Sequence, residues 1–426
     1  MEKLIVKAIN VSNNGHRINY DYTLTAGIKK YFNLDKPFYI EFQEDISSVP
    51  ESILAIPLVA NLAPIAWYAG FELEIEELDE DFSNALKVIK QDFLKRESVN
   101  ELKGDVIPKK VVQNTFEKSK TAMLFSGGVD AYATYIRIFD KTPDLITLLG
   151  ADIQIEDQKQ WTDFTNFVES EGLLKNNDKE YITANLRDFY TYQVELLLTD
   201  IGWWGKVQHG LALIGALAPL SYIKGYKEIY IASSYTDNIN IEWGSTPQID
   251  EAITWANGVQ VYHDGYDLKR QDKVDLIADF AEKADTKFKL RVCYSEKRTE
   301  FNCSYCEKCF RTIFGLILNN KNPNDYGFNV DGSVYDKMYT IFNIGSGSKG
   351  VRYFWWELME KAKSVDQFYV FSDEEAERKQ IDKIRSGSID QLLEQKLNTP
   401  KSKSQRLKFI IRNKFPWLRN MYRKIK

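Results

Sequence analysis

Apolar and polar residues form short blocks along the first 115 residues, and the block lengths predict a mixture of strands and helices. Apolar-rich runs of strand length lie at Leu4–Val11, Arg17–Leu24, Pro37–Gln43 and Phe71–Glu76. Helices are predicted over the apolar segment Pro50–Tyr68 and over Asp79–Arg96, where apolar positions recur with helical spacing. The polar stretch Glu97–Lys110 predicts a linker or loop. We therefore expect residues 1–115 to form an α+β module.

From Thr121 onward, apolar runs of strand length alternate with helical segments. Strands are predicted at Ala122–Phe125, Leu145–Leu149, Glu180–Asn185 and Glu228–Ala232, and helices at Ala131–Phe139, Trp161–Glu169, Trp204–Ile223 and Arg311–Leu318. This alternation is typical of an α/β fold with a parallel sheet and helices on both faces. Ligands of such sheets bind beyond the carboxyl ends of the strands. We therefore expect the loops at Ser126, Gly150 and Ser233–Ser234 to share one rim.

The remaining chain predicts helices over Val351–Lys361 and Asp373–Lys396. Four segments follow from this organisation, and they are the α+β module 1–115, an α/β domain 116–325, a helical region 326–400 and a basic amphipathic tail 401–426. No apolar run reaches the roughly 20 residues of a membrane span, and Met1 leads into a strand-like segment instead of a signal peptide. These features predict a cytoplasmic protein.

Charge is distributed unevenly. The formal net charge is −5, but the tail 401–426 holds ten basic residues and no acidic one, which leaves −15 on residues 1–400. An acidic body is not typical of nucleic-acid binding, so we expect no direct nucleic-acid partner. In the tail, basic residues alternate with aromatic and aliphatic ones. That pattern fits a helix lying on anionic lipid at the inner membrane surface, and equally a helix that docks on the acidic body.

The segment Phe125-Ser126-Gly127-Gly128-Val129-Asp130 joins a predicted strand to a predicted helix. Two adjacent glycines let the backbone approach a ligand closely, and the first amides of a helix favour an anion. The Ser126 hydroxyl can donate to a phosphate. Asp130 can contact a phosphate-bound Mg²⁺ or position the loop. The segment therefore predicts a phosphate site, and an ordinary strand–turn–helix connection is the alternative.

All four cysteines of the chain, Cys293, Cys303, Cys306 and Cys309, lie within seventeen positions. This clustering argues against a distributed disulfide framework. One divalent ion can gather four thiolates tetrahedrally, and Zn²⁺ is the usual ion in a protein without a redox role. We expect a structural zinc site that fixes the loop before the helix at Arg311. An iron–sulfur cluster and four unrelated buried cysteines are the alternatives.

The glycine-rich loop resembles the Ser-Gly-Gly-X-Asp-Ser motif of the PP-loop (N-type) ATP pyrophosphatase superfamily. The order of this loop and the later four-cysteine cluster is similar to that of the 7-cyano-7-deazaguanine synthases and their paralogues, over roughly residues 120–315. The resemblance implies a Rossmannoid, nucleotide α-hydrolase-like sheet. It further implies ATP with Mg²⁺ and cleavage between the α and β phosphates, so that a carboxylate or amide substrate is adenylated and AMP and pyrophosphate are formed.

Carried onto this chain, the resemblance assigns Ser126, Gly127, Gly128, Val129 and Asp130 to the pyrophosphate, and Leu149 and Gly150 to the adenine. It assigns Lys206 to the α phosphate. In the expected mechanism, either Lys206 or Arg270 neutralises the charge that develops as pyrophosphate leaves. The substrate loop corresponds to Ser233, Ser234 and Thr236, followed by Trp243 and Ser245. Position 131 is Ala where the motif has Ser, so one hydroxyl donor is missing; Thr134, one helical turn along, is a candidate replacement.

The histidines and the tryptophan pairs could each have a functional or a structural role. His209, near the start of a helix by the expected rim, is a candidate general base or a helix-end histidine with a hydrogen bond. His263-Asp264-Gly265 predicts a turn, and Asn13–His16 predicts the turn of a hairpin. The pairs Trp203-Trp204 and Trp355-Trp356 fit the core better than base stacking.

The expected activity is adenylation of a small-molecule or protein-borne carboxylate. A PP-loop epimerase or ligase of cell-surface polysaccharide or cell-wall precursor synthesis is an alternative, because a bacterial glutamate epimerase is similar in outline. A non-catalytic nucleotide-binding protein of the same fold is another, and Ala131 is its main support. A component of a defence system is a further alternative. A homodimer is compatible with the sequence.

Overall fold

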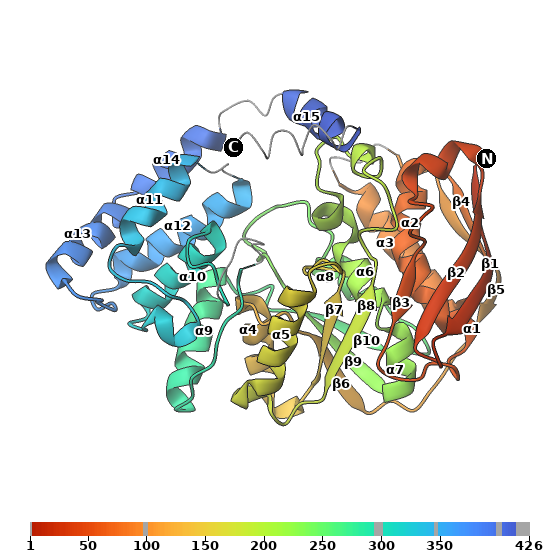
Figure 1. Ribbon diagram of the computed structural model, residues 1–426, viewed down its shortest axis with the longest axis horizontal. Helices are drawn as coiled ribbons and strands as arrows, with labels where there is room; N and C mark the ends of the chain where they lie inside the picture. Colours follow the sequence, from red (N-terminus) through yellow and green to blue (C-terminus); the bar gives the residue numbers. More distant parts are fainter. Residues whose placement is uncertain (1, 97–100, 294–300, 345–347, 398–402, 415–426) are drawn as a thin grey trace.

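The computed structural model describes residues 2–96, 101–293, 301–344, 348–397 and 403–414. Within these residues, ten strands form one mixed sheet with helices on both faces (Figure 1). The strands are β1 (Lys3–Ser12), β2 (Arg17–Leu24), β3 (Tyr39–Glu41), β4 (Glu72–Asp79), β5 (Asp105–Val112), β6 (Lys120–Leu124), β7 (Asp144–Leu149), β8 (Lys179–Ala184), β9 (Tyr226–Ala232) and β10 (Gln260–Asp264). The expected α/β class is confirmed.

Fifteen α-helices lie in the same described residues. They are α1 (Glu51–Leu54), α2 (Ile56–Ala69), α3 (Glu80–Leu94), α4 (Val129–Arg137), α5 (Gln158–Ser170), α6 (His209–Gly215), α7 (Ala218–Lys224), α8 (Pro247–Asp250), α9 (Arg270–Lys283), α10 (Glu307–Leu318), α11 (Val334–Ile344), α12 (Lys349–Ser364), α13 (Glu374–Arg385), α14 (Ser388–Leu397) and α15 (Lys403–Lys414). None of the described helices is long and apolar enough to cross a membrane.

Five strands of the sheet are parallel to one another, in the order β10-β9-β6-β7-β8. The chain runs from β6 through β7 to β8 on one side, and then returns to place β9 on the other side of β6. The direction of winding therefore changes between β6 and β9. In open parallel sheets, this switch point leaves a crevice at the carboxyl ends of the two strands. The loops after β6 and β9 meet at that crevice.

Alternating side chains of the parallel strands bury against two separate cores. In β7, Ile146 and Leu148 join the core that holds α1 to α3 and α6 to α8, whereas Leu145 and Leu149 join the core that holds α4, α5 and α9. Period-two alternation in a strand buried on both faces produces this division. Beyond α9, helices α10 to α14 extend the second core and form one end of the molecule (Figure 1).

The N-terminal strands continue the same sheet. Strand β3 pairs antiparallel with β8, where Ile40 lies opposite Ala184, and β2, β1, β4 and β5 follow outward. The sequence prediction of a linker over Glu97–Lys110 is wrong for its second half, because β5 pairs in parallel with β4. Residues 97–100 of that stretch lie outside the described residues. The predicted hairpin turn at Asn13–His16 is confirmed between β1 and β2.

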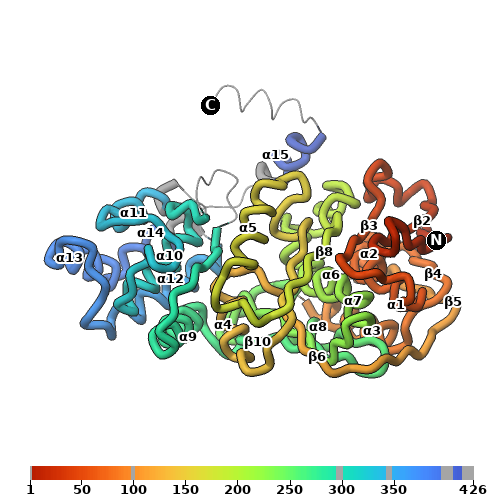
Figure 2. Tube along the Cα trace, turned by 60° about the horizontal axis from the view of Figure 1, so that its bottom comes forward, coloured from red at the N-terminus to blue at the C-terminus, as the bar shows by residue number. Residues whose placement is uncertain are grey.

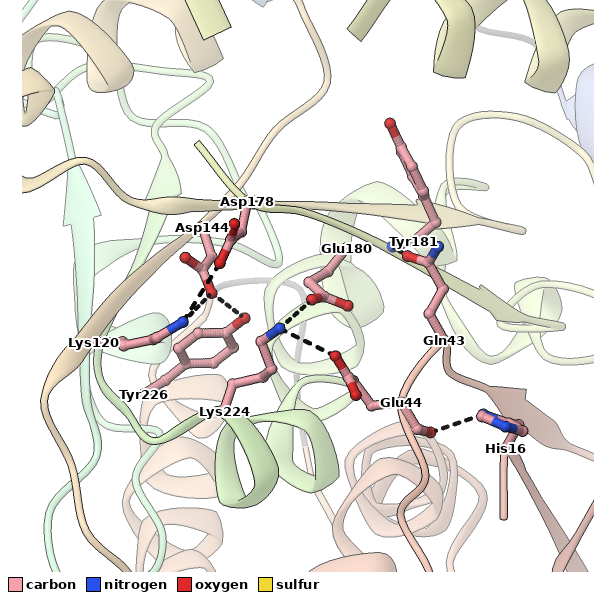
Figure 3. Close-up of polar contacts among 10 residues, drawn as sticks. All are labelled: His16, Gln43, Glu44, Lys120, Asp144, Asp178, Glu180, Tyr181, Lys224 and Tyr226. Atoms are coloured by element: carbon pink, nitrogen blue, oxygen red, sulfur yellow. Dashed lines mark hydrogen bonds and ion pairs between the residues drawn. The ribbon is translucent and has the colours of Figure 1, made fainter. Parts of the chain in front are cut away.

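Polar side chains join the N-terminal segment to the parallel strands at the amino ends of those strands (Figure 3). Lys224, at the end of α7, donates to Glu180 at 2.6 Å and to Glu44 at 3.1 Å. The Tyr226 hydroxyl donates to the Asp144 carboxylate at 2.9 Å, and burial raises the pKa of Asp144 above its ordinary value. These contacts lie at the edge of the sheet opposite the crevice, so they fix the sheet and leave the crevice unobstructed.

Three helices that the sequence predicts as continuous are interrupted. The segment Pro50–Tyr68 divides at Ala55 into α1 and α2. The segment Trp204–Ile223 divides into the π-helical turn η5 (Trp204–Gln208), α6 and α7. Pro219 in the first turn of α7 explains the break before it, because proline lacks an amide hydrogen and its ring clashes with the carbonyl four residues earlier. The segment Asp373–Lys396 divides at Gly387 into α13 and α14, since glycine commonly ends helices.

Candidate functional site

A cavity of about 400 Å³ lies at the crevice between the carboxyl ends of β6 and β9. Its lining includes Ser126 after β6, Ala151 after β7 and Ser234 after β9, so the three loops predicted to share one rim do meet there. Helices α9, α10 and α12 complete the wall through Arg270, Arg311 and other side chains. The volume falls in the ordinary range of small-molecule sites, roughly 300–1,000 Å³.

The glycine-rich loop forms the part of the lining where β6 turns into α4. Gly127 has a φ of +72°, a conformation that side-chain-bearing residues rarely adopt, and its carbonyl accepts from the Arg291 amide at 2.7 Å. Gly128 is the N-cap of α4 and has no side-chain cap. Its amide donates to the Ser126 hydroxyl at 3.4 Å, and Gly128, Val129 and Asp130 line the cavity. An uncapped helix start in a cavity favours an anion.

Asp130 is paired with two cations. Its carboxylate oxygens lie 2.8 Å from a guanidinium nitrogen of Arg270 and 3.3 Å from the ammonium nitrogen of Lys273. Lys273 also donates to the Ser233 carbonyl at 2.6 Å, which connects the loops after β6 and β9. Burial lowers the pKa of Lys273 below its ordinary value, and Asp130 opposes that change. Of the two roles considered for Asp130, this geometry supports positioning of the loop.

The part of the lining that comes from residues 270–311 carries mostly cationic side chains. Arg270, Arg291, Lys308 and Arg311 line the cavity together with two carboxylates, Asp130 and Asp152, and Glu307 lies 3.7 Å from Arg311 just outside the lining. Burial lowers the pKa of Lys308 and of Arg311 below their ordinary values, and the Arg270 charge adds to the effect. The Nε atoms of Arg270 and Arg311 are buried without a hydrogen-bond partner in the described residues. Buried cations of this kind are stabilised by a bound anion.

The opposite side of the cavity is aromatic. The His209 ring lies 5.4 Å from the rings of both Trp204 and Trp243, while Tyr235 contacts Trp243 edge-on and stacks on Phe354. Burial lowers the pKa of His209 below its ordinary value, so the imidazole is neutral at neutral pH. Its Nδ1 atom and the indole nitrogen of Trp243 have no partner in the part of the chain that the structure describes. This side therefore offers polar atoms to a ligand in an aromatic surrounding.

Several residues assigned by resemblance lie outside this lining. Lys206 is on η5 with its ammonium 3.8 Å from Asp200, beside a small separate cavity lined by Tyr68 and Arg96. Leu149 is buried in the core, whereas Leu148 and Ala151 line the cavity.

Gly150 is buried and does not line the cavity. It has a φ of +101°, and a Cβ there would lie 1.8 Å from the Ala184 carbonyl oxygen, so the position requires glycine. Thr134, the candidate replacement for the missing serine hydroxyl, is buried and does not line the cavity.

The predicted substrate loop is only partly in the cavity. Ser234 and Trp243 line it. Ser233 turns back to donate to the Tyr235 carbonyl at 2.6 Å, and Thr236 donates to Asp237. Ser245 is buried and donates to Asp250 at 2.6 Å. These three hydroxyl groups form hydrogen bonds within the protein that stabilise the loop conformation. Of the predicted substrate-loop residues, only Ser234 and Trp243 can contact a ligand in the cavity.

The same Asp250 carboxylate oxygen lies 2.7 Å from Nδ1 of His263. The predicted turn at His263-Asp264-Gly265 is wrong for its first two residues, which belong to β10. His263 is a buried structural residue at the edge strand.

Four sulfur atoms come together where α10 begins. The Sγ atoms of Cys303 and Cys309 are 3.7 Å apart, Cys306 lies 3.5 Å from Cys309 and 4.0 Å from Cys293, and all four lie within 4.8 Å of one another. A tetrahedral zinc ion with Zn–S bonds of about 2.3 Å requires sulfurs about 3.8 Å apart. The cluster therefore fits zinc. Cys306 caps α10, the helix that carries Lys308 and Arg311 into the cavity.

Some residues of the site carry no sequence signature. Arg311 and Lys308 are beside the cysteine motif, so their nearness to it could have indicated them. Phe354 comes from α12 and Arg291 from the segment before Cys293, and no spacing pattern connects them to the glycine-rich loop.

Comparison with known proteins gave no match to this chain among protein-family models, curated proteins or solved structures. The likeness to the PP-loop superfamily therefore rests on the two motifs, their order and their separation.

Proposed function

We propose that the chain is an ATP pyrophosphatase of the PP-loop type, with the Rossmannoid fold of that superfamily, which binds ATP in the cavity at the switch point. The observation that carries this proposal is the meeting of the uncapped start of α4 with Arg270, Lys308 and Arg311 in one cavity. A triphosphate is the ligand that best matches several buried cations together with free helix amides.

The two sides of the cavity suggest how the nucleotide and the acceptor divide it. The phosphates would lie over Gly128 and Val129, close to Arg270. The apolar residues Leu148, Ala151 and Phe164 line the adjacent wall and suit the adenine base. The aromatic side, with His209 and Trp243, is left for the acceptor. Because Asp130 is held by two cations, Asp152 is the lining carboxylate that could assist a phosphate-bound Mg²⁺.

In the proposed reaction, a carboxylate or amide oxygen of the acceptor attacks the α phosphorus of ATP, and the bond to the bridging oxygen of pyrophosphate breaks. The products are an adenylated acceptor and pyrophosphate, and release of AMP follows when a second nucleophile attacks the adenylate. Arg270 and Arg311 would neutralise the charge that develops on the phosphates. His209, which burial keeps neutral and which lines the cavity, would accept a proton from that second nucleophile. ATP consumption and four thiolate ligands both suit the cytoplasm.

The direct test is calorimetric titration of zinc-loaded protein with Mg²⁺-ATP, followed by incubation with candidate acids and detection of AMP and pyrophosphate. Asp130→Ala removes the partner of Arg270 and Lys273 and should abolish both binding and pyrophosphate release. Asp140→Ala, an exposed carboxylate just beyond the other end of α4, is the matched control and should behave as wild type. A folded wild-type protein that binds neither ATP nor AMP contradicts the proposal.

A non-catalytic nucleotide-binding role is the second candidate, and it is favoured by Ala131. This residue lines the cavity without a hydroxyl, and Thr134 does not replace it there. ATP binding without pyrophosphate release for any acceptor would support this role. An epimerase or ligase of cell-surface or cell-wall precursor synthesis shares the adenylation step, so the identity of the acceptor and the product formed from the adenylate separate it from the first proposal.

A further inference from the structure

Helix α15 presents one face to the rest of the molecule and another to solvent. On the inner face, the Arg406 guanidinium donates to the backbone carbonyls of Leu196 at 2.8 Å and of Leu198 at 2.9 Å, and the Phe409 ring packs edge-on against a neighbouring tyrosine ring. On the outer face, Leu407 is 57% exposed and Ile411 39% exposed. These two residues are four positions apart, so they lie on one side of the helix.

Basic side chains flank the exposed aliphatic pair. Lys408, Arg412 and Lys414 are all exposed, and the sequence of α15 contains no acidic residue. None of the described basic side chains of α15 forms an ion pair with a carboxylate of the body, and Arg406 bonds only to carbonyl groups. The contact with the body therefore leaves the charge of the outer face uncompensated. Both views place α15 at the periphery of the molecule (Figure 1, Figure 2).

We propose that the outer face of α15 is a docking surface for an anionic phospholipid membrane. Exposed aliphatic side chains beside basic ones are the composition of helices that lie in the plane of a membrane interface. The aliphatic pair inserts among the acyl chains, and the basic groups bind the phosphates of the lipid headgroups. A nucleic acid would offer phosphates to the same cations but no apolar partner for Leu407 and Ile411, so the observations favour lipid. The inner face stays bound to the loop at Leu196–Thr199.

The test is flotation of the full-length protein with two kinds of vesicle, phosphatidylcholine alone and an equal mixture of phosphatidylcholine and phosphatidylglycerol. The protein should float with the mixed vesicles and not with the neutral ones, and added salt should release it, because the attraction between headgroups and cations is screened. Binding should be reversible, since a single short helix provides limited apolar area.

Two variants separate the apolar and charged contributions. Lys408→Gln/Arg412→Gln/Lys414→Gln should lower partitioning on the order of a hundredfold, because each basic group near an anionic surface contributes about fivefold. Leu407→Ser/Ile411→Ser removes the apolar side chains without changing the charge, and it should strongly reduce flotation while leaving the fold intact, since both side chains are already exposed. The matched control is Lys103→Gln/Lys109→Gln/Lys110→Gln, which removes the same charge from exposed positions at the far end of the sheet and should float as wild type.

Three outcomes would overturn the proposal. They are failure of the wild-type protein to float with anionic vesicles, equal loss of flotation in the Lys103/Lys109/Lys110 control, and undiminished flotation of both α15 variants. Binding of duplex DNA that is lost in the Lys408/Arg412/Lys414 variant and kept in the Leu407/Ile411 variant, without flotation of the wild type, would assign the surface to nucleic acid instead.

Discussion

The Asp130 carboxylate lies 2.8 Å from a guanidinium nitrogen of Arg270, inside the lining of the cavity. Asp130 belongs to the first turn of α4, and Arg270 is the first residue of α9, 140 positions later in the chain. The pair therefore fixes the glycine-rich loop against the helix that brings the principal cation to the site. Lys273, one turn further along α9, completes the arrangement through the same carboxylate and is almost fully buried.

Asp130→Asn should destabilise the protein by about 3 kcal/mol, because removal of one partner leaves the buried Lys273 ammonium uncompensated. Urea unfolding at neutral pH measures this loss. Asp140→Asn, an exposed change of the same kind, should have no measurable effect. Equal stability of Asp130→Asn and wild type would show that the pair does not neutralise Lys273.

The loss in Asp130→Asn should diminish as pH rises. Burial holds the pKa of Lys273 below 10.5 in the folded chain, and removal of Asp130 lowers it further. Between the folded and unfolded pKa values the unfolded state binds more protons, so stability increases with pH there. Unfolding measured just below the ordinary lysine pKa should therefore show a smaller difference between variant and wild type than at neutral pH. A constant difference would contradict this assignment.

Removal of zinc should disorder the start of α10 and weaken anion binding in the cavity together. Cys306 caps this helix, and Lys308 and Arg311 follow within its first turns. Cys303→Ser or treatment with a strong chelator should lower the unfolding temperature markedly, because structural zinc contributes binding free energies of about 10–16 kcal/mol to folding. Zinc content by mass spectrometry and ATP titration provide the two measurements. Tyr305→Phe, an exposed residue between the ligands, is the control.

The central strands could be predicted from the sequence because their own side chains determine them. Segments β6, β7 and β9 are short apolar runs that bury on both faces, and the predicted ranges overlap the observed ones closely. Strand β5 could not be predicted in the same way. It is an edge strand in which an aspartate, a proline and two lysines interrupt the apolar residues, and it is held by pairing with β4 alone among the described strands. Its structure depends on a partner that its own pattern does not specify.

The residues of the candidate site also fall into two groups, those that belong to local sequence motifs and those that only the tertiary fold brings together. The glycine-rich loop and the cysteine cluster are local motifs, so the sequence indicated them. Phe354 and Arg291 reach the cavity only because α12 and the segment before Cys293 pack beside it, which is a property of the tertiary fold. Lys206 is the opposite case, because the resemblance assigns it to the site and the tertiary structure does not bring it there. The π-helical turn η5 directs its side chain toward Asp200, whereas Trp204 and His209 line the cavity.

Arg96 braces the aromatic side of the cavity from the N-terminal part of the chain. Its guanidinium donates to the Lys206 carbonyl at 2.6 Å and to the Trp243 carbonyl at 2.9 Å, so it joins η5 to the loop that carries Trp243. Arg96→Ala should accelerate amide hydrogen exchange at Gly210 and Gly244, whose amides close the same junction. Exchange in the glycine-rich loop and the affinity for ATP should not change.

Arg96→Lys should restore at most part of the protection, because a lysine cannot bridge both carbonyls in the same fork-like geometry. Lys87→Ala, on the exposed side of α3, is the control. Uniform acceleration of exchange over the whole sheet in Arg96→Ala would mean that Arg96 supports global stability and has no particular effect on this junction.

Glu357 should make the protein less stable as the solution passes from mildly acidic to neutral pH. The side chain is buried on α12. Its Oε2 accepts a hydrogen bond from the backbone amide of Gln271 at 3.1 Å, and its Oε1 has no partner among the described residues. Burial raises the pKa of Glu357 to about 7, from 4.5 in the unfolded chain. The folded state therefore binds more protons in this window, and ionisation costs it about 3 kcal/mol by the upper end.

Glu357→Gln keeps the acceptor for the Gln271 amide and removes the titration. The variant should therefore be more stable than wild type above pH 7, and its advantage should shrink toward the acidic end of the window as Glu357 becomes protonated in the wild type. Urea unfolding midpoints measured across the window test this. Glu360→Gln, an exposed change on the same helix, controls for the loss of surface charge. If Glu357→Gln follows the pH dependence of the wild type throughout, the carboxyl is ionised in the folded state at both ends, and a counter-charge must reach Oε1 in solution.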